Sequence, residues 1–195
     1  MKILVVDIET TGFLNKGGKI VEVGMVELDL ETGNTKIVFD KVTHERPITR
    51  KQVEESWIVN NSDLTVEDIR YSKEFKHLKN EIQEIIYSYP AGATAYNNAF
   101  DFGFFKSRGI NIPNVLPDPM LILTDMIKIP APPKVKKYGK KYKFPNVEEA
   151  WNYLFPNINY IEKHRGADDA LHEAKIIYQL HKTGKFKTEF ETEYV

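Results

Sequence analysis

An apolar run at the start of the chain limits the fold more than any other feature. Residues 2–8 are almost all β-branched residues or leucine, and the run ends at two carboxylates and the turn Thr10-Thr11-Gly12. A strand with one solvated face would alternate polar and apolar residues, so this run favours a strand that is buried on both faces. We therefore expect it at the centre of a sheet.

The rest of the chain predicts an α/β arrangement. Strand-like runs at 20–30 and 35–42 flank a turn of hairpin composition, and residues 49–88 are expected to be helical, with the clearest apolar periodicity at 75–86. Strand-like and helical segments then alternate, which favours a mixed central β-sheet flanked by helices, in ribonuclease H-like topology. The expected strands are 92–96 and the apolar run 120–129, and the expected helices are 98–108, 147–155 and 168–182.

Length and composition limit the class of protein. At 195 residues and 42% hydrophobic content, the chain suits one domain, expected over 1–182 with a polar tail at 183–195. The absence of cysteine excludes disulfides, thiolate zinc sites and cysteine nucleophiles. A net charge of -1 means that any contact with nucleic acid must be local. The first apolar run is too short for a signal peptide and no stretch could span a bilayer, so we expect a cytoplasmic protein without membrane contact.

Asp7 and Glu9 are the first candidate site residues. They are separated by one residue on the expected strand, so both side chains leave the same face and can converge on one cation. Acids that directly follow a buried strand lie at its carboxyl end, where open α/β sheets build their sites. Thr10, Thr11 and Gly12 then form a turn whose backbone N–H groups could meet a phosphate or a terminal sugar. Alone, the pair also fits a strand end that reaches solvent.

A second candidate segment runs from Asn97 to Asp101. These two residues share a face if a helix begins there, so Asn97 could orient Asp101 or a phosphate. Asn97 or Asn98 could instead cap the helix, while the phenylalanines from Phe100 to Phe105 are expected mainly in the core. Among these rings Asp101 would lose its hydration unless a cation or a donor met it, so we interpret it as a ligand. Phe100, beside the acid, is a candidate contact for substrate.

The third segment, 164–169, leads into the last helix. Asp168 lies on an entirely polar helical stripe with His172, so we expect Asp168 to cap the helix or face solvent and His172 to be an ordinary surface histidine. Asp169 shares its stripe with Ile176 and should face the protein. Asp169 is therefore the expected ligand.

Lysine and proline dominate residues 130–145, which we expect to form an exposed loop. The segment holds six lysines, four prolines and no acid, and aromatic residues stand between the lysines. This combination could neutralise phosphates and stack unpaired bases, although a merely solvated loop explains it equally well. Neutralising four of the lysines is expected to weaken binding and flatten its salt dependence. The four are Lys136, Lys137, Lys140 and Lys141.

Taken in order, the three segments resemble the three motifs of the DEDDh exonucleases, the DnaQ-like family, and are similar to the proofreading epsilon-subunit type of DNA polymerase III. Residues 7–12 resemble the first motif, 97–101 the second with its Asn-x-x-Phe-Asp pattern, and 164–169 the third with histidine five before aspartate. A sister subfamily has tyrosine four before the last aspartate, where this chain has Arg165. Many relatives carry histidine and alanine at the positions of Tyr96 and Asn98, and the lysine-rich loop is longer than usual, which leaves substrate preference open.

The resemblance implies a ribonuclease H-like fold and a 3'-to-5' exonuclease with two Mg2+ or Mn2+ ions. Asp7 would bridge both ions, Glu9 and Asp169 would complete one site, and Asp101 would hold the other largely through water. Carboxylates suit these hard cations, which can activate water and stabilise the leaving oxygen. His164 would act as general base, because its ordinary pKa lies near neutrality; as an alternative, it could simply pack beneath the last helix.

Three interpretations of the activity follow from these motifs. The first is removal of nucleoside 5'-monophosphates from the 3' end of single-stranded DNA, which overall likeness to proofreading exonucleases favours. The second is trimming of RNA 3' ends by the same residues. The third is a catalytically silent domain that binds nucleic acid or a polymerase, which fits poorly with five intact motif residues. The expected partner is nucleic acid with a free 3' end, and a DNA polymerase is a further candidate partner.

Overall fold

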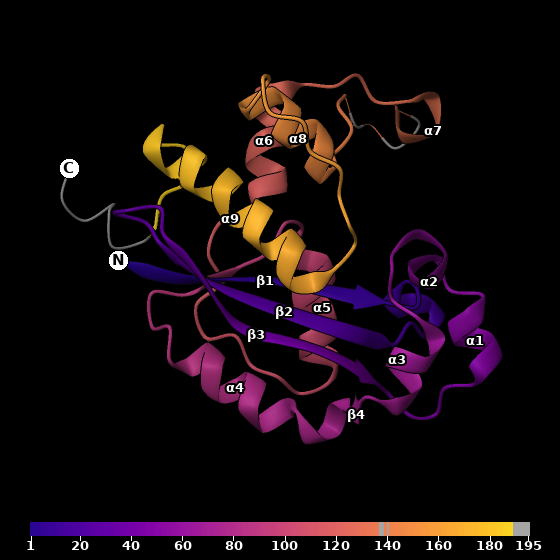
Figure 1. Ribbon diagram of the computed structural model, residues 1–195. Helices are drawn as coiled ribbons and strands as arrows, with labels where there is room; N and C mark the ends of the chain where they lie inside the picture. The colour runs from indigo at the N-terminus through magenta and orange to yellow at the C-terminus, as the bar shows by residue number, and fades with distance from the viewer. Residues whose placement is uncertain (137–138, 140, 189–195) are drawn as a thin grey trace.

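One mixed sheet organises the computed structural model, which describes residues 1–136, 139 and 141–188 (Figure 1). Its strand order is β4-β3-β2-β1-β5; β2 is antiparallel to both β1 and β3, whereas β5 is parallel to β1 and β4 is parallel to β3. The expected central strand, the three sequential strands and the mixed α/β sheet are confirmed. The bounds are β1 (Lys2–Thr10), β2 (Ile20–Asp29), β3 (Thr35–His44), β4 (Lys73–Glu74) and β5 (Ala93–Thr94).

Helices cover both faces of this sheet (Figure 1). On one face lie α9 (Gly166–Lys182), α6 (Pro119–Ile127) and α8 (Val147–Leu154), and on the other lie α4 (Lys79–Tyr87) and α5 (Asn98–Ser107). The expected helical stretch 49–88 is broken into pieces, because Thr49 and Thr65 each form a capping box that starts a new short helix. The remaining helices are α1 (Arg50–Glu54), α2 (Trp57–Asn61), α3 (Val66–Tyr71) and α7 (Pro133–Lys136), with 3-10 turns at Leu14–Lys16 and Phe75–His77.

The central strand separates two hydrophobic cores. Ile3 and Val5 pack with α6, α8 and α9, whereas Leu4 and Val6 pack with α4 and α5. This alternation follows from the two-residue period of a strand. Asp7 and Glu9 continue the odd-numbered series, so their side chains leave β1 on the face that α9 covers.

One expected strand is a helix. The apolar run 120–129 forms most of α6, because the Asp118 side chain accepts a hydrogen bond from the Met120 N–H and Pro119 occupies the first helical turn. Pro119, Met120 and Leu123 are the buried residues of the helix, which is a helical spacing. A short apolar run cannot by its pattern alone be assigned to a strand or a buried helix.

Two glycines bring α9 against the sheet. Gly24 of β2 is paired with Asp7 of β1, and a Cβ atom at Gly24 would lie 2.1 Å from the carbonyl carbon of Gly166 and 2.2 Å from the Ala167 nitrogen. A Cβ atom at Gly166 would lie 2.8 Å from the Gly24 nitrogen. Only paired glycines permit this backbone contact, which places the start of α9 beside Asp7.

The expected loop 130–145 and the expected tail 183–195 are not wholly exposed to solvent. The loop is closed by a bridge between Pro130 and Tyr142 and contains α7, while Phe186 of the expected tail is buried in the core under α9. Lys136 and Lys141 are exposed, and Lys137 and Lys140 lie outside the described residues. Of the helices described, none has the length and apolar character that crossing a membrane requires.

Candidate active site

Two carboxylates from β1 begin the site. Oδ2 of Asp7 is buried, and within the described part of the chain it has no hydrogen-bond partner. Burial raises the pKa of Asp7 well above its usual range, and the neighbouring carboxylates of Glu173 and Glu9 raise it further. Burial and the charge of Asp169 likewise raise the pKa of Glu9. A buried carboxylate oxygen without a donor is the arrangement that a bound cation would relieve.

Asp101 reaches the same place from the start of α5. Its side chain is 3% exposed, and its Oδ1 accepts a hydrogen bond from the Ile8 N–H on β1 at 3.1 Å. Burial raises the pKa of Asp101, although hydrogen bonds from backbone N–H groups oppose the shift. Asp101 is thereby tied directly to the strand that carries Asp7 and Glu9.

Of the two roles expected of Asn97, orienting Asp101 is not seen among the described residues, and contact with a phosphate stays a prediction. Asn97 adopts a left-handed backbone conformation with φ of 81°, and among the described residues its side chain makes no hydrogen bond to Asp101. The start of α5 is capped by a residue distant in sequence, because the Asp118 carboxylate accepts hydrogen bonds from the N–H groups of Asn97 and Asn98. The Asn98 side chain accepts a hydrogen bond from the Ala95 N–H. Asp118 therefore orients the segment that presents Asp101.

Asp169 completes the cluster from the first turn of α9. Its carboxylate accepts hydrogen bonds from the Tyr160 hydroxyl at 2.9 Å and from the Arg165 N–H at 2.7 Å. Ligand atoms of Glu9, His164 and Asp169 all lie within 4.8 Å of one another. Asp168 is 29% exposed and its Oδ1 pairs with Lys163 at 2.9 Å, whereas its Oδ2 is buried without a hydrogen-bond partner among the described residues.

His164 is held at the open side of these carboxylates. Its φ of 57° is unusual for a residue with a side chain, and its ring packs edge-on against Trp57, with centroids 4.6 Å apart. The carboxylate of Glu162 lies 3.9 Å from Nδ1 of His164. Burial and the charge of Asp169 raise the pKa of Glu162 to about 7. Neither Trp57 nor Glu162 stands out in the sequence.

Glu173 is a further buried acid that the sequence analysis missed. It is 2% exposed and accepts a hydrogen bond from the Tyr96 N–H at 3.3 Å. Burial and the charge of Asp101 raise its pKa, and its own charge acts on Asp7. The signal was present, because position 173 lies four residues after Asp169 and so on the same helical stripe.

Beside the carboxylates lies a cavity of about 410 Å³. Glu9 forms its acidic edge, and Phe13, Trp57 and Phe100 supply aromatic walls. Phe100 is half-buried and packs edge-on against Phe13, whereas Phe102, Phe104 and Phe105 are buried in the core as expected. Phe100 is therefore the phenylalanine of α5 that is placed to contact a ligand.

Thr10 and Gly12 line this cavity, but Thr11 does not have the free backbone N–H that was expected. The Thr11 N–H donates to the Lys19 carbonyl at 2.9 Å, and the Thr11 hydroxyl accepts from the Lys19 N–H at 3.0 Å. The Thr10 hydroxyl donates to the Gly12 carbonyl. Thr11 thus closes the loop 11–19, and its backbone N–H is not available to substrate.

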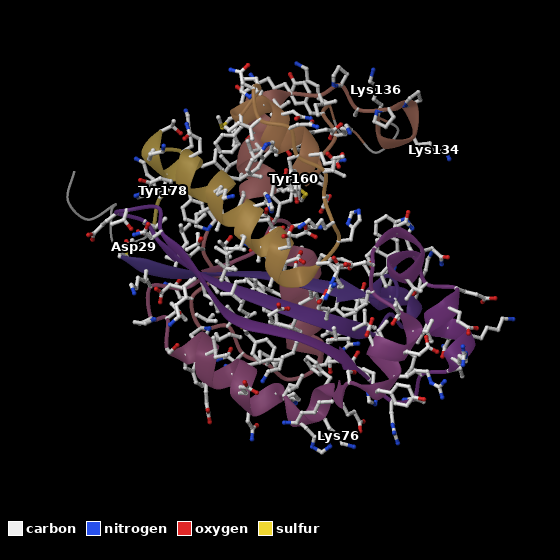
Figure 2. The ribbon with its side chains drawn as sticks, in the orientation of Figure 1. Asp29, Lys76, Lys134, Lys136, Tyr160 and Tyr178 are labelled. Atoms are coloured by element: carbon white, nitrogen blue, oxygen red, sulfur yellow. The ribbon has the colours of Figure 1, made fainter. Side chains whose placement is uncertain are left out.

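His172 is also not the surface histidine that its polar stripe suggested. Its ring stacks on Tyr160, with centroids 4.2 Å apart, and meets Trp151 edge-on at 5.3 Å. Tyr160 lies between α8 and α9 (Figure 2). The stripe is polar in composition but faces α8 and its aromatic side chains. His172 therefore supports the tyrosine that bonds to Asp169.

Comparison with known proteins assigns the chain to a family. The family profile RNase_T, described as exonuclease, matches residues 4–177, and no curated protein matches. The chain belongs to this exonuclease family and is a nuclease, a hydrolase of phosphodiester bonds. The match supports the likeness to the DEDDh exonucleases, whose members generally use divalent metal ions.

Solved structures share the fold. Cell-death related nuclease 4 (CRN-4) superposes with a TM-score of 0.66 at 14% identity, over 96% of this chain and 66% of that one. The nuclease domain of 3'hExo, a DEDDh family member bound to rAMP, gives 0.62 at 15% identity, over 96% of both chains. A 3'-exonuclease whose structure concerns recognition of the histone mRNA stem-loop gives 0.59 at 16%, over 96% and 84%. The expected ribonuclease H-like exonuclease fold is confirmed.

Proposed function

We propose that this protein is a 3'-to-5' exonuclease that removes nucleoside 5'-monophosphates from single-stranded nucleic acid with the help of two Mg2+ or Mn2+ ions. The observation that carries the proposal is the convergence of four acids from β1, α5 and α9 with His164 at their open side. Four mutually repelling carboxylates would destabilise a fold that did not use them.

The residues fit hard divalent cations. Asp7 offers a buried oxygen without a donor, and the pKa values of Asp7, Glu9 and Asp101 are all raised, as expected for anions that lack a counter-charge. We assign Asp7, Glu9, Asp101 and Asp169 as the groups that would hold the ions. Bound ions would supply an activated water, neutralise charge at phosphorus and stabilise the leaving oxygen.

His164 is proposed as the general base. Its ring lies among the carboxylates, and Trp57 and the unusual backbone conformation fix its position. The nearby Glu162 carboxylate would stabilise the imidazolium that forms when His164 takes a proton from water. A positioned base contributes about 100- to 10,000-fold to such a reaction.

The terminal nucleotide has a place in the cavity beside Glu9. Rings of Phe13, Trp57 and Phe100 line it, and aromatic faces stack unpaired bases of any sequence. Thr10 and Gly12 lie at the same wall and are proposed to contact the terminal sugar or phosphate. This arrangement suits a single strand, because a paired terminal base could not enter between the rings.

The substrate could be DNA or RNA. Likeness to proofreading exonucleases favoured DNA, whereas two structural neighbours concern RNA, one bound to rAMP and one recognising an mRNA stem-loop. RNA trimming is therefore the second candidate function. Association with a DNA polymerase and a cytoplasmic location stay predictions.

The test is digestion of matched 5'-labelled DNA and RNA strands with Mg2+ and with a chelator. We expect a stepwise ladder of shortened labelled strands with Mg2+ alone, and the ratio of the two rates assigns the substrate. Products cut at internal positions would contradict the proposal, as would full activity in the chelator.

A further inference from the structure

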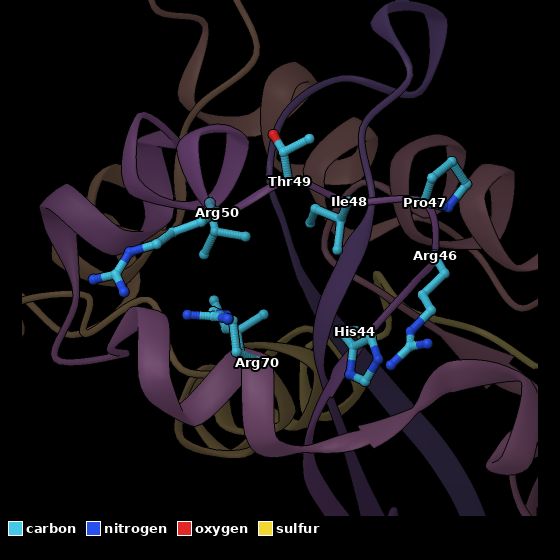
Figure 3. Close-up of a pocket in the computed structure, with 9 residues that line it drawn as sticks. His44, Arg46, Pro47, Ile48, Thr49, Arg50 and Arg70 are labelled. Atoms are coloured by element: carbon cyan, nitrogen blue, oxygen red, sulfur yellow. The ribbon is translucent and has the colours of Figure 1, made fainter.

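A second cavity, of about 630 Å³, lies beyond the carboxylate cluster between the end of β3 and the helices α1 and α3. Three arginines line it, and its lining contains no acid. Figure 3 shows Arg50 and Arg70 on one side of the hollow and Arg46 with His44 on the other, with Ile48 between them. Such a concave basic surface is suited to anions.

The arginines are not fully neutralised by neighbouring carboxylates. Arg50 pairs with Glu54 and Glu67, but within the described chain Arg46 and Arg70 have no carboxylate oxygen within 4.0 Å. Glu45 directly precedes Arg46 in the sequence, but the Glu45 carboxylate is already paired with another cation.

Arg108 forms this ion pair with Glu45. Its Nε and Nη2 donate to the two carboxylate oxygens of Glu45 at 2.8 and 2.6 Å, and Nη2 also donates to the Gly18 carbonyl. Arg46 therefore keeps its positive charge for a ligand, although an acid is its neighbour in sequence.

A smaller cavity lies next to both this basic hollow and the aromatic cavity of the candidate active site, since it shares lining residues with each. It measures about 250 Å³ and shares Gly12 and Phe13 with the aromatic cavity and Ile48 with the basic one. Lys16 and Lys19 line it, and among the described residues neither has a carboxylate oxygen within 4.0 Å. The three cavities are therefore neighbours, and together they make a candidate path along the loop 11–19.

We infer that this path binds the substrate strand on the 5' side of the nucleotide that is removed, with phosphates of that strand at Lys16 and Lys19 and then at Arg46 and Arg70. The inference rests on the proposed function, because it needs the 3' end to lie at the carboxylates. The distribution of charge supports the inference. The whole chain carries a net charge of -1, yet five cationic side chains and no acid line the basic cavity and the smaller cavity beside it. Backbone phosphates are the groups that such a row of cations recognises without regard to sequence.

The test compares the double variant Arg46→Ala/Arg70→Ala with the matched control Lys182→Ala/Lys185→Ala. Both variants remove two exposed positive charges, and the control lies at the end of α9, far from α1 and α3 in Figure 1. The probes are a thymidine dinucleotide and an oligothymidylate of about twelve nucleotides, a length that fills a typical single-strand site. Cleavage is measured with Mg2+, and binding is measured in chelator over a salt series.

We expect Arg46→Ala/Arg70→Ala to raise the KM for the long strand about tenfold and to reduce the slope of log binding constant against log salt by about 1.4, since each single-strand phosphate contact contributes about 0.7. Cleavage of the dinucleotide should stay unchanged, because it is too short to reach the arginines. The control should match the wild type on both probes.

Two results would overturn the inference: a long-strand KM and salt slope equal to those of the control, or an equal loss on the dinucleotide and the long strand. If the wild-type protein cleaves neither these DNA probes nor the matched uridine RNA probes with Mg2+ or Mn2+, the proposed function fails. The salt slope in chelator still decides whether Arg46 and Arg70 bind a strand.

Discussion

Glu22 on β2 accepts hydrogen bonds from the guanidinium of Arg165, at 3.1 Å from Nε and 2.8 Å from Nη2, although 143 residues separate the two. Glu22 is 1% exposed and also accepts from the Gly166 N–H at 3.1 Å. Arg165 directly follows His164 and donates its own N–H to Asp169. The ion pair therefore fixes the third motif to the sheet that carries the first.

Removing the arginine tests this coupling. Arg165→Ala leaves the carboxylate of Glu22 buried without its cation, so we expect the free energy of unfolding to fall by about 3 kcal/mol, the low end of the range for a broken buried pair because Arg165 is 31% exposed. Nuclease activity should fall with it. The measurement is denaturant unfolding together with strand digestion.

The control is Asp63→Asn, which removes the exposed partner of the same guanidinium and should change stability by less than about 1 kcal/mol. Glu22→Gln/Arg165→Ala should recover part of the loss, since no buried charge remains. Equal stability of Arg165→Ala and Asp63→Asn would refute the coupling.

The contact between β2 and α9 predicts a second effect. Gly24→Ala places a methyl group 2.1 Å from the Gly166 carbonyl carbon, so α9 must move away from Asp7, and we expect a stability loss of about 1 to 3 kcal/mol and reduced activity. Gly103→Ala is the matched control, because its nearest neighbour is Leu14 Cδ2 at 3.9 Å and alanine favours a helix by about 0.5 to 1 kcal/mol. The melting temperatures of both variants are measured and compared with that of the wild type. A Gly24→Ala protein as stable and active as the wild type would show that the position of α9 does not depend on this contact.

Tyr160→Phe tests the support of the proposed metal ligand Asp169. It deletes the hydroxyl that bonds Asp169 at 2.9 Å but keeps the ring stacked on His172. Loss of such a supporting bond typically weakens metal affinity 10- to 100-fold, so the Mg2+ concentration for half-maximal activity should rise about tenfold with little change in the melting temperature. An unchanged Mg2+ midpoint would argue that Tyr160 has only a packing role.

Metal-free protein should lose stability as pH rises. The pKa values of Asp7, Glu9, Asp101 and Glu173 are raised by burial, so above their usual pKa the folded state binds more protons than the unfolded state. The free energy of unfolding then falls with increasing pH. In chelator, we expect a lower melting temperature at about pH 8 than at about pH 5.5, a window in which exposed carboxylates are ionised in both states.

Two controls test whether the loss of stability with rising pH comes from the buried carboxylates and not from other titrating groups. Mg2+ at about pH 8 should raise the melting temperature, because it binds only the folded cluster, and Asp101→Asn should flatten the pH dependence in chelator. A melting temperature that is constant or increases between these pH values in metal-free protein would contradict the account.

Much of the fold followed from local pattern. The run 2–8 predicted the central strand because burial on both faces leaves a composition that a solvated strand does not have. Strand and helix periodicity singled out Asp7, Glu9 and Asp169, whereas the role of His164 came from the family resemblance. The run 120–129 was assigned wrongly because its apolar character fits strand and helix alike, and Asp118 with Pro119 decided for the helix.

The supporting residues could not be predicted in the same way. Glu22 and Arg165 meet across 143 residues, and Trp57 reaches His164 from another helix, so neither relationship leaves a spacing in the sequence. Gly24 within a strand did carry a signal, since a strand glycine often marks the close approach of another backbone.

Release of the 3'-terminal nucleotide tests the central claim most directly. A single strand labelled in that nucleotide is incubated with the wild-type protein and Mg2+, with chelator, and with Asp7→Asn protein. We predict labelled nucleoside 5'-monophosphate as the first product in the first reaction, and none in the other two. Release of the label as a longer fragment, or release by Asp7→Asn at the wild-type rate, would contradict the account.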